Sequence, residues 1–188
     1  MHRSVASTIA ARIGPALRAR RLCLVLAALA GAPALAAGAL QDEEPPFADL
    51  GRPLAHYATI ARNDGAFRRL WIDEASLAKA RRGEPLPDGT AIAMETFYGP
   101  QNRATVFVKL KQGSTWLYGS FEPGQPDWTG LKAKTVCHAC HIDAAQDLTF
   151  TLPVLAKFGE TRRVARLLCD QPGRAPCEAD FYAHAGAP

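Results

Sequence analysis

Acidic residues are absent from the first 40 positions of this 188-residue chain. The same stretch holds five arginines, and the 19 residues from Leu22 to Leu40 carry no charge. Basic residues followed by a hydrophobic run and small residues are typical of a secretory signal peptide. Ala34-Leu35-Ala36 fits the A-x-A cleavage pattern, so we expect residues 1–36 to be a cleaved signal peptide and the protein to be periplasmic. The competing interpretation is an uncleaved membrane anchor, because the uncharged run nearly spans a bilayer.

An excess of basic charge is absent from the remainder of the chain. Beyond residue 36, 17 lysines and arginines face 18 aspartates and glutamates, a net charge of −1, although the whole chain has a pI of about 8.9. The basic character therefore belongs to the leader. Proteins that bind nucleic acid usually carry a basic patch, so the sequence predicts no nucleic-acid partner.

The 152 residues after position 36 suffice for one domain with its own core. Short strand-like segments separated by short turns predict an antiparallel β meander. The three segments of this meander are 90–98, 104–111 and 114–121, and 66–73 is a further strand-like segment. Helices are expected at 73–83, between a capping Asp73 and Gly83, within 132–146, and within 155–168. The predicted fold class is α+β, an antiparallel sheet with flanking helices at its end or face.

The chain contains the motif Cys137-His138-Ala139-Cys140-His141. It lacks a second C-x-x-C motif and an H-x-x-x-H pair, and this lack weakens the interpretation of the motif as a zinc site. A structural zinc site needs four ligands, and the fourth would have to be His138 or Cys169. A redox dithiol is expected in a βαβ context that the neighbouring sequence does not show. The C-x-x-C-H spacing is instead the attachment pattern of haem c.

This spacing suits haem because two thiols three positions apart each bond one former vinyl group of the porphyrin. The next residue, a histidine, then lies under the ring and binds the iron. We therefore expect one covalent haem c per chain, with Cys137 and Cys140 as tethers and His141 as the metal ligand. The later cysteines, Cys169 and Cys177, flank a Pro/Gly loop and are expected to form a disulfide in an oxidising compartment.

Methionine is scarce, and Met94 is the only one beyond the leader. An electron-transfer cytochrome usually has a sixth iron ligand, commonly Met or His. One interpretation makes Met94 that ligand, on the far side of the iron from His141. The other makes it a core residue, which is the usual role of a methionine in an apolar strand. The spacing leaves both interpretations open.

Four short motifs, in order, give the sequence a resemblance to a known family. They are Pro87-Asp88-Gly89-Thr90, Trp116 to Gly119, the C-x-x-C-H motif, and Asp147 to Phe150. Over about residues 50–155 the chain resembles the cytochrome P-460 family, which includes cytochrome c′-β. The resemblance implies a β-rich fold around one haem c, often as a homodimer, with an iron whose distal face is open in the reduced state.

The family divides by function, and this sequence departs from the enzymatic pattern. P-460-type members oxidise hydroxylamine with a lysine cross-linked to the porphyrin and a distal carboxylate, whereas c′-β members bind nitric oxide beside distal phenylalanines. The resemblance places Met94 at the lysine position and Thr105 near the carboxylate position. Glu95 is adjacent to Met94, and alternation along a strand turns it to the opposite face, but a shift of the alignment by one residue would make it the carboxylate, so it stays a candidate. Phe97 and Phe107 are the candidates for an apolar distal wall.

The predicted organisation has four parts: a signal peptide at 1–36, an N-terminal arm at 37–49, a cytochrome P-460-like haem domain at 50–155 and a C-terminal extension at 156–188. The predicted function is that of an exported mono-haem c-type cytochrome. It would bind a small gas such as nitric oxide at the iron, or transfer electrons to a redox partner protein. The alternative is a haem oxidoreductase that oxidises hydroxylamine or a related small nitrogen compound.

Overall fold

The computed structural model describes residues 51–80, 84–144, 146–173 and 175–187. All of them belong to the second of the two units into which the chain divides, Asp42–Pro188. The predicted signal peptide and N-terminal arm therefore lie outside the described residues. None of the described helices is long and apolar enough to cross a membrane.

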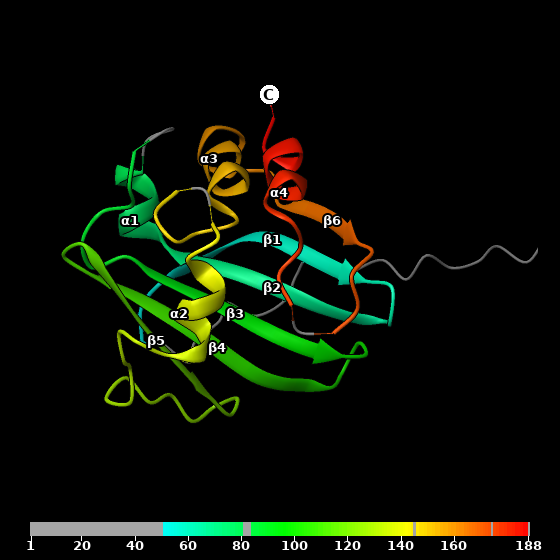
Figure 1. The fold of residues 1–188 in the computed structure, drawn as a ribbon, viewed down its shortest axis with the longest axis horizontal. Helices are drawn as coiled ribbons and strands as arrows, with labels where there is room; N and C mark the ends of the chain where they lie inside the picture. Colours follow the sequence, from blue (N-terminus) through cyan, green and yellow to red (C-terminus); the bar gives the residue numbers. More distant parts are fainter. Residues whose placement is uncertain (1–50, 81–83, 145, 174, 188) are drawn as a thin grey trace, which may run out of the picture. The chain divides into compact units, whose positions relative to one another are not determined.

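The described residues form one six-stranded sheet with the strand order β5-β4-β3-β2-β1-β6 (Figure 1). The strands are β1 Leu54–Arg62, β2 Ala66–Asp73, β3 Ala91–Tyr98, β4 Arg103–Gln112, β5 Thr115–Phe121 and β6 Ala165–Cys169. Strands β2 to β5 are the four segments predicted from the sequence, and all neighbours from β1 to β5 pair antiparallel. The prediction of a purely antiparallel sheet is wrong, because the chain crosses from the β5 edge to the opposite edge, where β6 pairs parallel with β1.

Four helices occur in the described part of the chain: α1 Glu74–Lys79, α2 Val136–His141, α3 Leu152–Thr161 and α4 Ala179–Ala185. Helix α3 packs on β1 and α4, α4 also contacts β6, and α2 contacts β5. In Figure 1, α3 and α4 are seen above β1, and α2 is drawn in front of the central strands. The fold is α+β, as predicted, with a mixed sheet.

Two of the predicted helices end earlier than the sequence indicates. Within 132–146, only Val136 to His141 is helical, and Asp147 and Leu148 then adopt positive φ angles of 50° that an α-helix does not allow. Within 155–168, α3 ends in a left-handed Arg162 with φ 56°, and the chain continues as β6. Both corrections arise where the backbone leaves the right-handed helical region.

Alternation along the strands divides the sheet into two buried faces. One face carries Tyr57, Ile60, Leu70, Ile72, Ile92 and Trp116, which pack with Leu152, Val154, Leu155 and Phe158 of α3. The other face carries Leu54, Trp71, Ala93, Val106, Val108 and Phe121. Cys137 of α2 packs against the first cluster. The parity of a strand residue therefore decides whether it faces the C-x-x-C-H helix.

Asp73 joins the end of β2 to the start of both α1 and β3. Its Oδ1 accepts the backbone N–H of Ser76 at 2.8 Å, which confirms Asp73 as the N-cap, and its Oδ2 accepts the N–H of Ala91 at 2.8 Å. The side chain is only 6% exposed, so water does not replace these bonds. The helix itself ends at Lys79, short of the predicted cap at Gly83, which lies outside the described residues.

Replacing Asp73 with alanine is expected to lower the free energy of unfolding by about 2–4 kcal/mol, because two buried N–H groups lose their acceptor. Equilibrium urea denaturation followed by circular dichroism measures the loss. Asp88→Ala is the matched control, since Asp88 accepts a single N–H, from Gly113, at an exposed turn. Its expected cost is below about 1 kcal/mol, and equal losses in the two variants would contradict the role given to Asp73.

Candidate functional site

A cavity of about 480 Å³ opens on the sheet face that carries the larger core cluster. The sheet lines it with Ile60, Arg68, Leu70, Ile92, Met94, Thr96, Tyr98, Thr105, Phe107, Val108, Lys109, Tyr118 and Gly119. The other walls are Val136, Cys137, Cys140 and His141 from α2, then Thr149, Phe150 and Thr151, and finally Ala175, Pro176 and Tyr182. This volume is typical of a cofactor site. A smaller pocket of about 270 Å³, between α1 and α3, contains no cysteine or histidine.

Helix α2 presents the C-x-x-C-H motif to this cavity. Thr135 caps the helix, because its Oγ1 accepts the backbone N–H of His138 at 3.2 Å. Cys137, Cys140 and His141 are three and four positions apart, so they share one side of the helix, and all three line the cavity. Neither cysteine is in a disulfide. Two thiols and one imidazole therefore face the same space.

The ring of His141 is held by a backbone carbonyl. Its Nδ1 lies 2.7 Å from the oxygen of Leu148, and because a carbonyl only accepts, Nδ1 carries the hydrogen. This tautomer leaves Nε2 with its lone pair, which is the form that binds a metal. Burial, followed by the nearby charge of Lys109, lowers the pKa of His141 to about 4, so the imidazole is neutral at pH 7. The rings of Tyr118 and Phe150 flank it at 5.4 and 5.6 Å between centroids.

The carbonyl of Leu148 accepts a second hydrogen bond, from the ammonium group of Lys109. Lys109 Nζ lies 2.9 Å from Leu148 O and 2.5 Å from Thr149 Oγ1, and it stands 4.0 Å above the ring of Trp116. The side chain is 6% exposed, and this burial lowers the pKa of Lys109 to about 7. The side-chain nitrogen of Lys109 and the candidate iron ligand His141 thus share one oxygen.

Asp147 fixes the turn that carries the Leu148 carbonyl. Its carboxylate pairs with Lys111 Nζ at 2.8 and 2.9 Å and accepts Trp116 Nε1–H at 3.2 Å and the backbone N–H of Leu86 at 2.8 Å. Both members of the ion pair are buried, with side chains 6% and 8% exposed. The Trp and Asp of two motifs that carry the family resemblance are therefore bonded to each other, directly behind His141.

The residues predicted for the far side of the iron divide between the two faces of the sheet. Met94, Thr105 and Phe107 line the cavity, and Met94 pairs with Phe107 across β3 and β4. Phe97 does not line it. Its ring stacks on Phe67 at 4.5 Å between centroids, beneath the guanidinium of Arg69. Phe97 has the opposite parity to Met94, so its assignment to the distal wall is incorrect.

Glu95 lies away from the cavity, as alternation predicts. One oxygen accepts the indole N–H of Trp71 at 2.6 Å, and the other pairs with Arg103 at 2.7 Å. Trp71 belongs to the core of the opposite face. No aspartate or glutamate is among the described residues that line the cavity.

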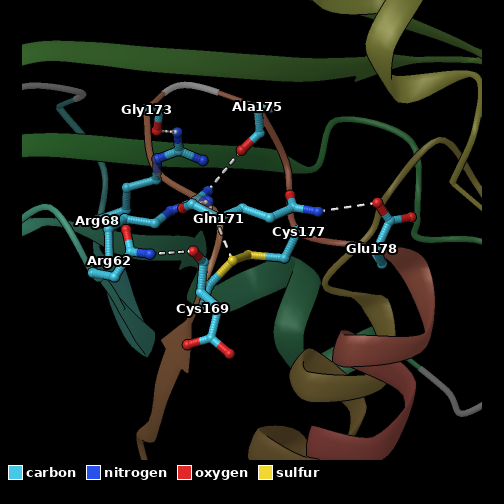
Figure 2. The surroundings of a disulfide bond; sticks show 10 residues. Arg62, Arg68, Cys169, Gln171, Gly173, Ala175, Cys177 and Glu178 are labelled. Atoms are coloured by element: carbon cyan, nitrogen blue, oxygen red, sulfur yellow. Dashed lines mark hydrogen bonds between the residues drawn. A yellow bond between two sulfur atoms is a disulfide. The ribbon is translucent and has the colours of Figure 1, made fainter.

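The C-terminal segment forms one wall of the cavity. Cys169 and Cys177 are joined in a disulfide, with their Cα atoms 6.3 Å apart. Figure 2 shows the guanidinium groups of Arg62 and Arg68 beside this loop, where they donate to the carbonyls of Gln171, Ala175 and Gly173. The loop then supplies Ala175 and Pro176 to the lining, and α4 supplies Tyr182.

The zinc alternative gains no support from the described residues, which contain no group of three or more His, Cys, Asp or Glu side chains placed to hold a metal ion. His138 does not line the cavity, and its ring packs against Tyr118 with centroids 6.0 Å apart. Comparison with known proteins adds no family, because no protein-family model and no curated protein matches the chain.

The residues around the cavity fit a haem c. Two unbridged thiols and a neutral imidazole stand at one corner, and Leu70, Ile92 and Phe107 give the sheet wall an apolar surface for a macrocycle. The buried hydroxyls of Thr96 and Tyr118 line the same cavity and have no hydrogen-bond partner within the described structure. Buried polar groups are normally paired, so these two favour an occupant that carries polar atoms.

Among the cavity residues that sequence reasoning missed are Arg68, Lys109 and Tyr118. Arg68 stands two positions before Leu70, and Lys109 stands two positions after Phe107. Residues two positions apart on a strand point to the same face of the sheet, so Arg68 shares a face with Leu70, and Lys109 shares one with Phe107. A charged residue that shares a face with apolar residues is a signal of burial, because solvent-facing charges alternate with buried apolar residues.

The buried ion pair behind His141 gives a stability prediction. Asp147→Ala is expected to lower the free energy of unfolding by about 3–5 kcal/mol, because Lys111 is left as a buried, unpaired charge. Asp127→Ala serves as the control, since Asp127 accepts its hydrogen bonds within one exposed turn. Thermal and urea unfolding of both variants make the comparison. A loss in Asp147→Ala no larger than in Asp127→Ala would disprove the anchoring role.

The buried ammonium of Lys109 gives a pH prediction. An unfolded lysine titrates near 10.4, so between pH 7 and about 10 the unfolded state binds more protons than the folded state and stability rises with pH. One such group contributes up to about 1.4 kcal/mol per pH unit. We expect Lys109→Met to remove this part of the slope when unfolding free energies are measured at pH 7.5, 8.5 and 9.5. An unchanged slope would show that Lys109 titrates normally.

Proposed function

We propose that the protein is an exported mono-haem c-type cytochrome of the cytochrome P-460/c′-β type that binds a small gas, such as nitric oxide, at the haem iron. The observation that carries this proposal is the convergence of Cys137, Cys140 and His141 on one cavity with an apolar sheet wall. A haem c held there would supply an iron that binds a diatomic ligand and changes oxidation state. In this proposal the two cysteines tether the macrocycle and His141 Nε2 is the proximal ligand.

The chain's own residues have definite tasks in this proposal. The Leu148 carbonyl holds His141 in the Nδ1–H tautomer, and the Asp147–Lys111 pair keeps that carbonyl in place. Leu70 and Phe107 exclude water from the sheet side of the cavity. The absence of a carboxylate among the described lining residues favours gas binding over hydroxylamine oxidation, which in the family uses a distal carboxylate.

Electron transfer is the second candidate, and it is favoured by the position of Met94. This side chain lines the cavity and is only partly buried, so its thioether is accessible to an iron ligated by His141. Gas binding needs an open sixth position, whereas electron transfer with Met94 as ligand fills it. One spectrum therefore separates the two functions.

The deciding experiment is the ferrous absorption spectrum of the purified holoprotein, with and without nitric oxide. Gas binding predicts a five-coordinate ferrous iron whose spectrum changes when nitric oxide is added, in the wild type and equally in Met94→Leu. A six-coordinate, low-spin spectrum that ignores nitric oxide and becomes high-spin in Met94→Leu would establish Met94 ligation instead. A main ferrous band far to the red of ordinary haem c, with hydroxylamine turnover, would favour the oxidoreductase.

Covalent attachment has its own test. Cys137→Ala with Cys140→Ala is expected to abolish covalent haem, measured as the haem mass added to the exported protein. Cys169→Ala with Cys177→Ala is the matched control, because it also removes two cysteines but leaves the C-x-x-C-H motif complete. Covalent haem in the first variant would overturn the whole proposal.

A further inference from the structure

Arg68 lines one corner of the cavity, and a second buried arginine, Arg62, lies beside it behind the lining. Arg62 is 3% exposed and Arg68 is 7% exposed. Arg62 donates to the backbone oxygens of Gln171 and Ala175 at 2.9 and 2.8 Å and to Cys169 Sγ at 3.2 Å. Arg68 Nη2 donates to Gly173 O at 3.0 Å. Every one of these acceptors is neutral, so the hydrogen bonds leave both charges uncompensated.

The nearest carboxylate, Asp64, is engaged elsewhere. It is exposed, and its two oxygens accept the backbone N–H groups of Ala66 and Gly173. The titratable groups around Arg68 are Arg62, Asp64, Tyr98 and Tyr182. Burial, followed by the charge of Arg62, lowers the pKa of Arg68 to about 10, so it remains a cation at neutral pH. A buried cation is stable when an anion pairs with it. Asp64 acts on Arg68 through its charge alone, and the acceptor bonded to Arg68 Nη2 is the neutral oxygen of Gly173.

Arg68 faces the cavity as part of a polar row that crosses the apolar sheet. In the strand register Arg68 pairs with Thr96, and Thr96 pairs with Thr105. All three line the cavity, and the buried Oγ1 of Thr96 has no partner in the described structure. A guanidinium beside an unpaired hydroxyl is a donor set that suits a carboxylate or a small oxyanion.

This row lies diagonally opposite the C-x-x-C-H corner. Lys109 and Tyr118 pair with each other beside His141, four residues along β4 from Thr105. Strand geometry puts the two rows about 14 Å apart along the strands, and the three strand steps from β5 to β2 add about 14 Å across them. The two propionates of a haem c leave the macrocycle at the edge opposite the thioether-bearing pyrroles. A haem tethered at Cys137 and Cys140 that lay across the sheet face would bring its carboxylates to the side of the cavity that holds Arg68.

We propose that Arg68, assisted by the hydroxyl of Thr96, binds a propionate carboxylate of the haem. This inference rests on the proposed haem function. The same guanidinium donates to Gly173, so the disulfide-closed loop and the carboxylate edge of the haem are joined through one side chain. A free oxyanion such as nitrite has the same chemistry, and the experiment below separates the two sources.

The reduction potential of the holoprotein between about pH 5 and 9 is the readout. Arg68→Gln is expected to lower the potential at neutral pH, because an uncompensated carboxylate near the iron stabilises the ferric state. It is also expected to add a pH-dependent step that the wild type lacks, as the released propionate titrates within the range. Arg68→Lys restores most of the wild-type profile, and Thr96→Val causes a smaller fall in the same direction. Arg163→Gln, which removes an exposed arginine, leaves the profile unchanged.

An Arg68→Gln holoprotein with the wild-type potential and pH profile would overturn the proposal. If that variant does not accumulate, Thr96→Val decides, and a wild-type potential and pH profile in Thr96→Val would overturn the proposal. Nitrite is then titrated into the ferric wild type and Arg68→Gln. Nitrite affinity that falls in the variant while the pH profile stays the same would assign the site to a free oxyanion and reject the propionate. If the mass of the wild-type protein shows no covalent haem, the proposed function itself is wrong. The mass is measured before any reduction potential, so this outcome is distinguished from a failure of the Arg68 proposal.

Discussion

The carbonyl oxygen of Leu148 is the point on which the geometry of the candidate site depends. It accepts from His141 Nδ1 and from Lys109 Nζ, so the orientation of the imidazole and the position of a buried cation are set together. The carbonyl points inward because Asp147 and Leu148 both have positive φ, and Asp147 is held there by Lys111, Trp116 and the N–H of Leu86. A strained turn is retained when its surroundings determine it this firmly. Helix α2 carries the two thiols and the imidazole, while sheet residues Lys111 and Trp116 hold the turn that orients the imidazole.

Much of the central sheet was predictable, because β3, β4 and β5 are joined by short turns and each strand from β2 to β5 carries its own hydrophobic pattern. The end of α2 was not, since no helix-breaking residue occurs between Lys132 and Gln146, and the turn that follows is fixed by bonds to residues more than 30 positions away. The pairing of β6 with β1 is likewise a long-range contact that no local pattern records. Local sequence patterns predict individual helices and strands. The path of the chain between them depends on contacts with residues that are distant in sequence.

The candidate site shows the same division. That Cys137, Cys140 and His141 lie together was predictable, because residues three and four positions apart share one side of a helix. The assignment of Phe97 failed because residue type was weighed above strand parity, and a register irregularity between Thr96 and Phe97 follows Met94 by only two positions. Charged side chains are mostly exposed, so residue type alone does not predict the burial of Arg68 and Lys109. Their burial follows from a cavity that the sheet, α2 and the C-terminal segment enclose together.

The wall formed by Ala175, Pro176 and Tyr182 has a consequence for assembly. These residues follow α2 by more than thirty positions, so the thiols of Cys137 and Cys140 exist in the emerging chain before that wall does. A disulfide between Cys169 and Cys177 closes the loop that carries Ala175 and Pro176. In the proposed haem c protein, thioether bonds at Cys137 and Cys140 and this disulfide would form in the same compartment during the same interval. The order of these four cysteines along the chain would then favour haem attachment before disulfide formation.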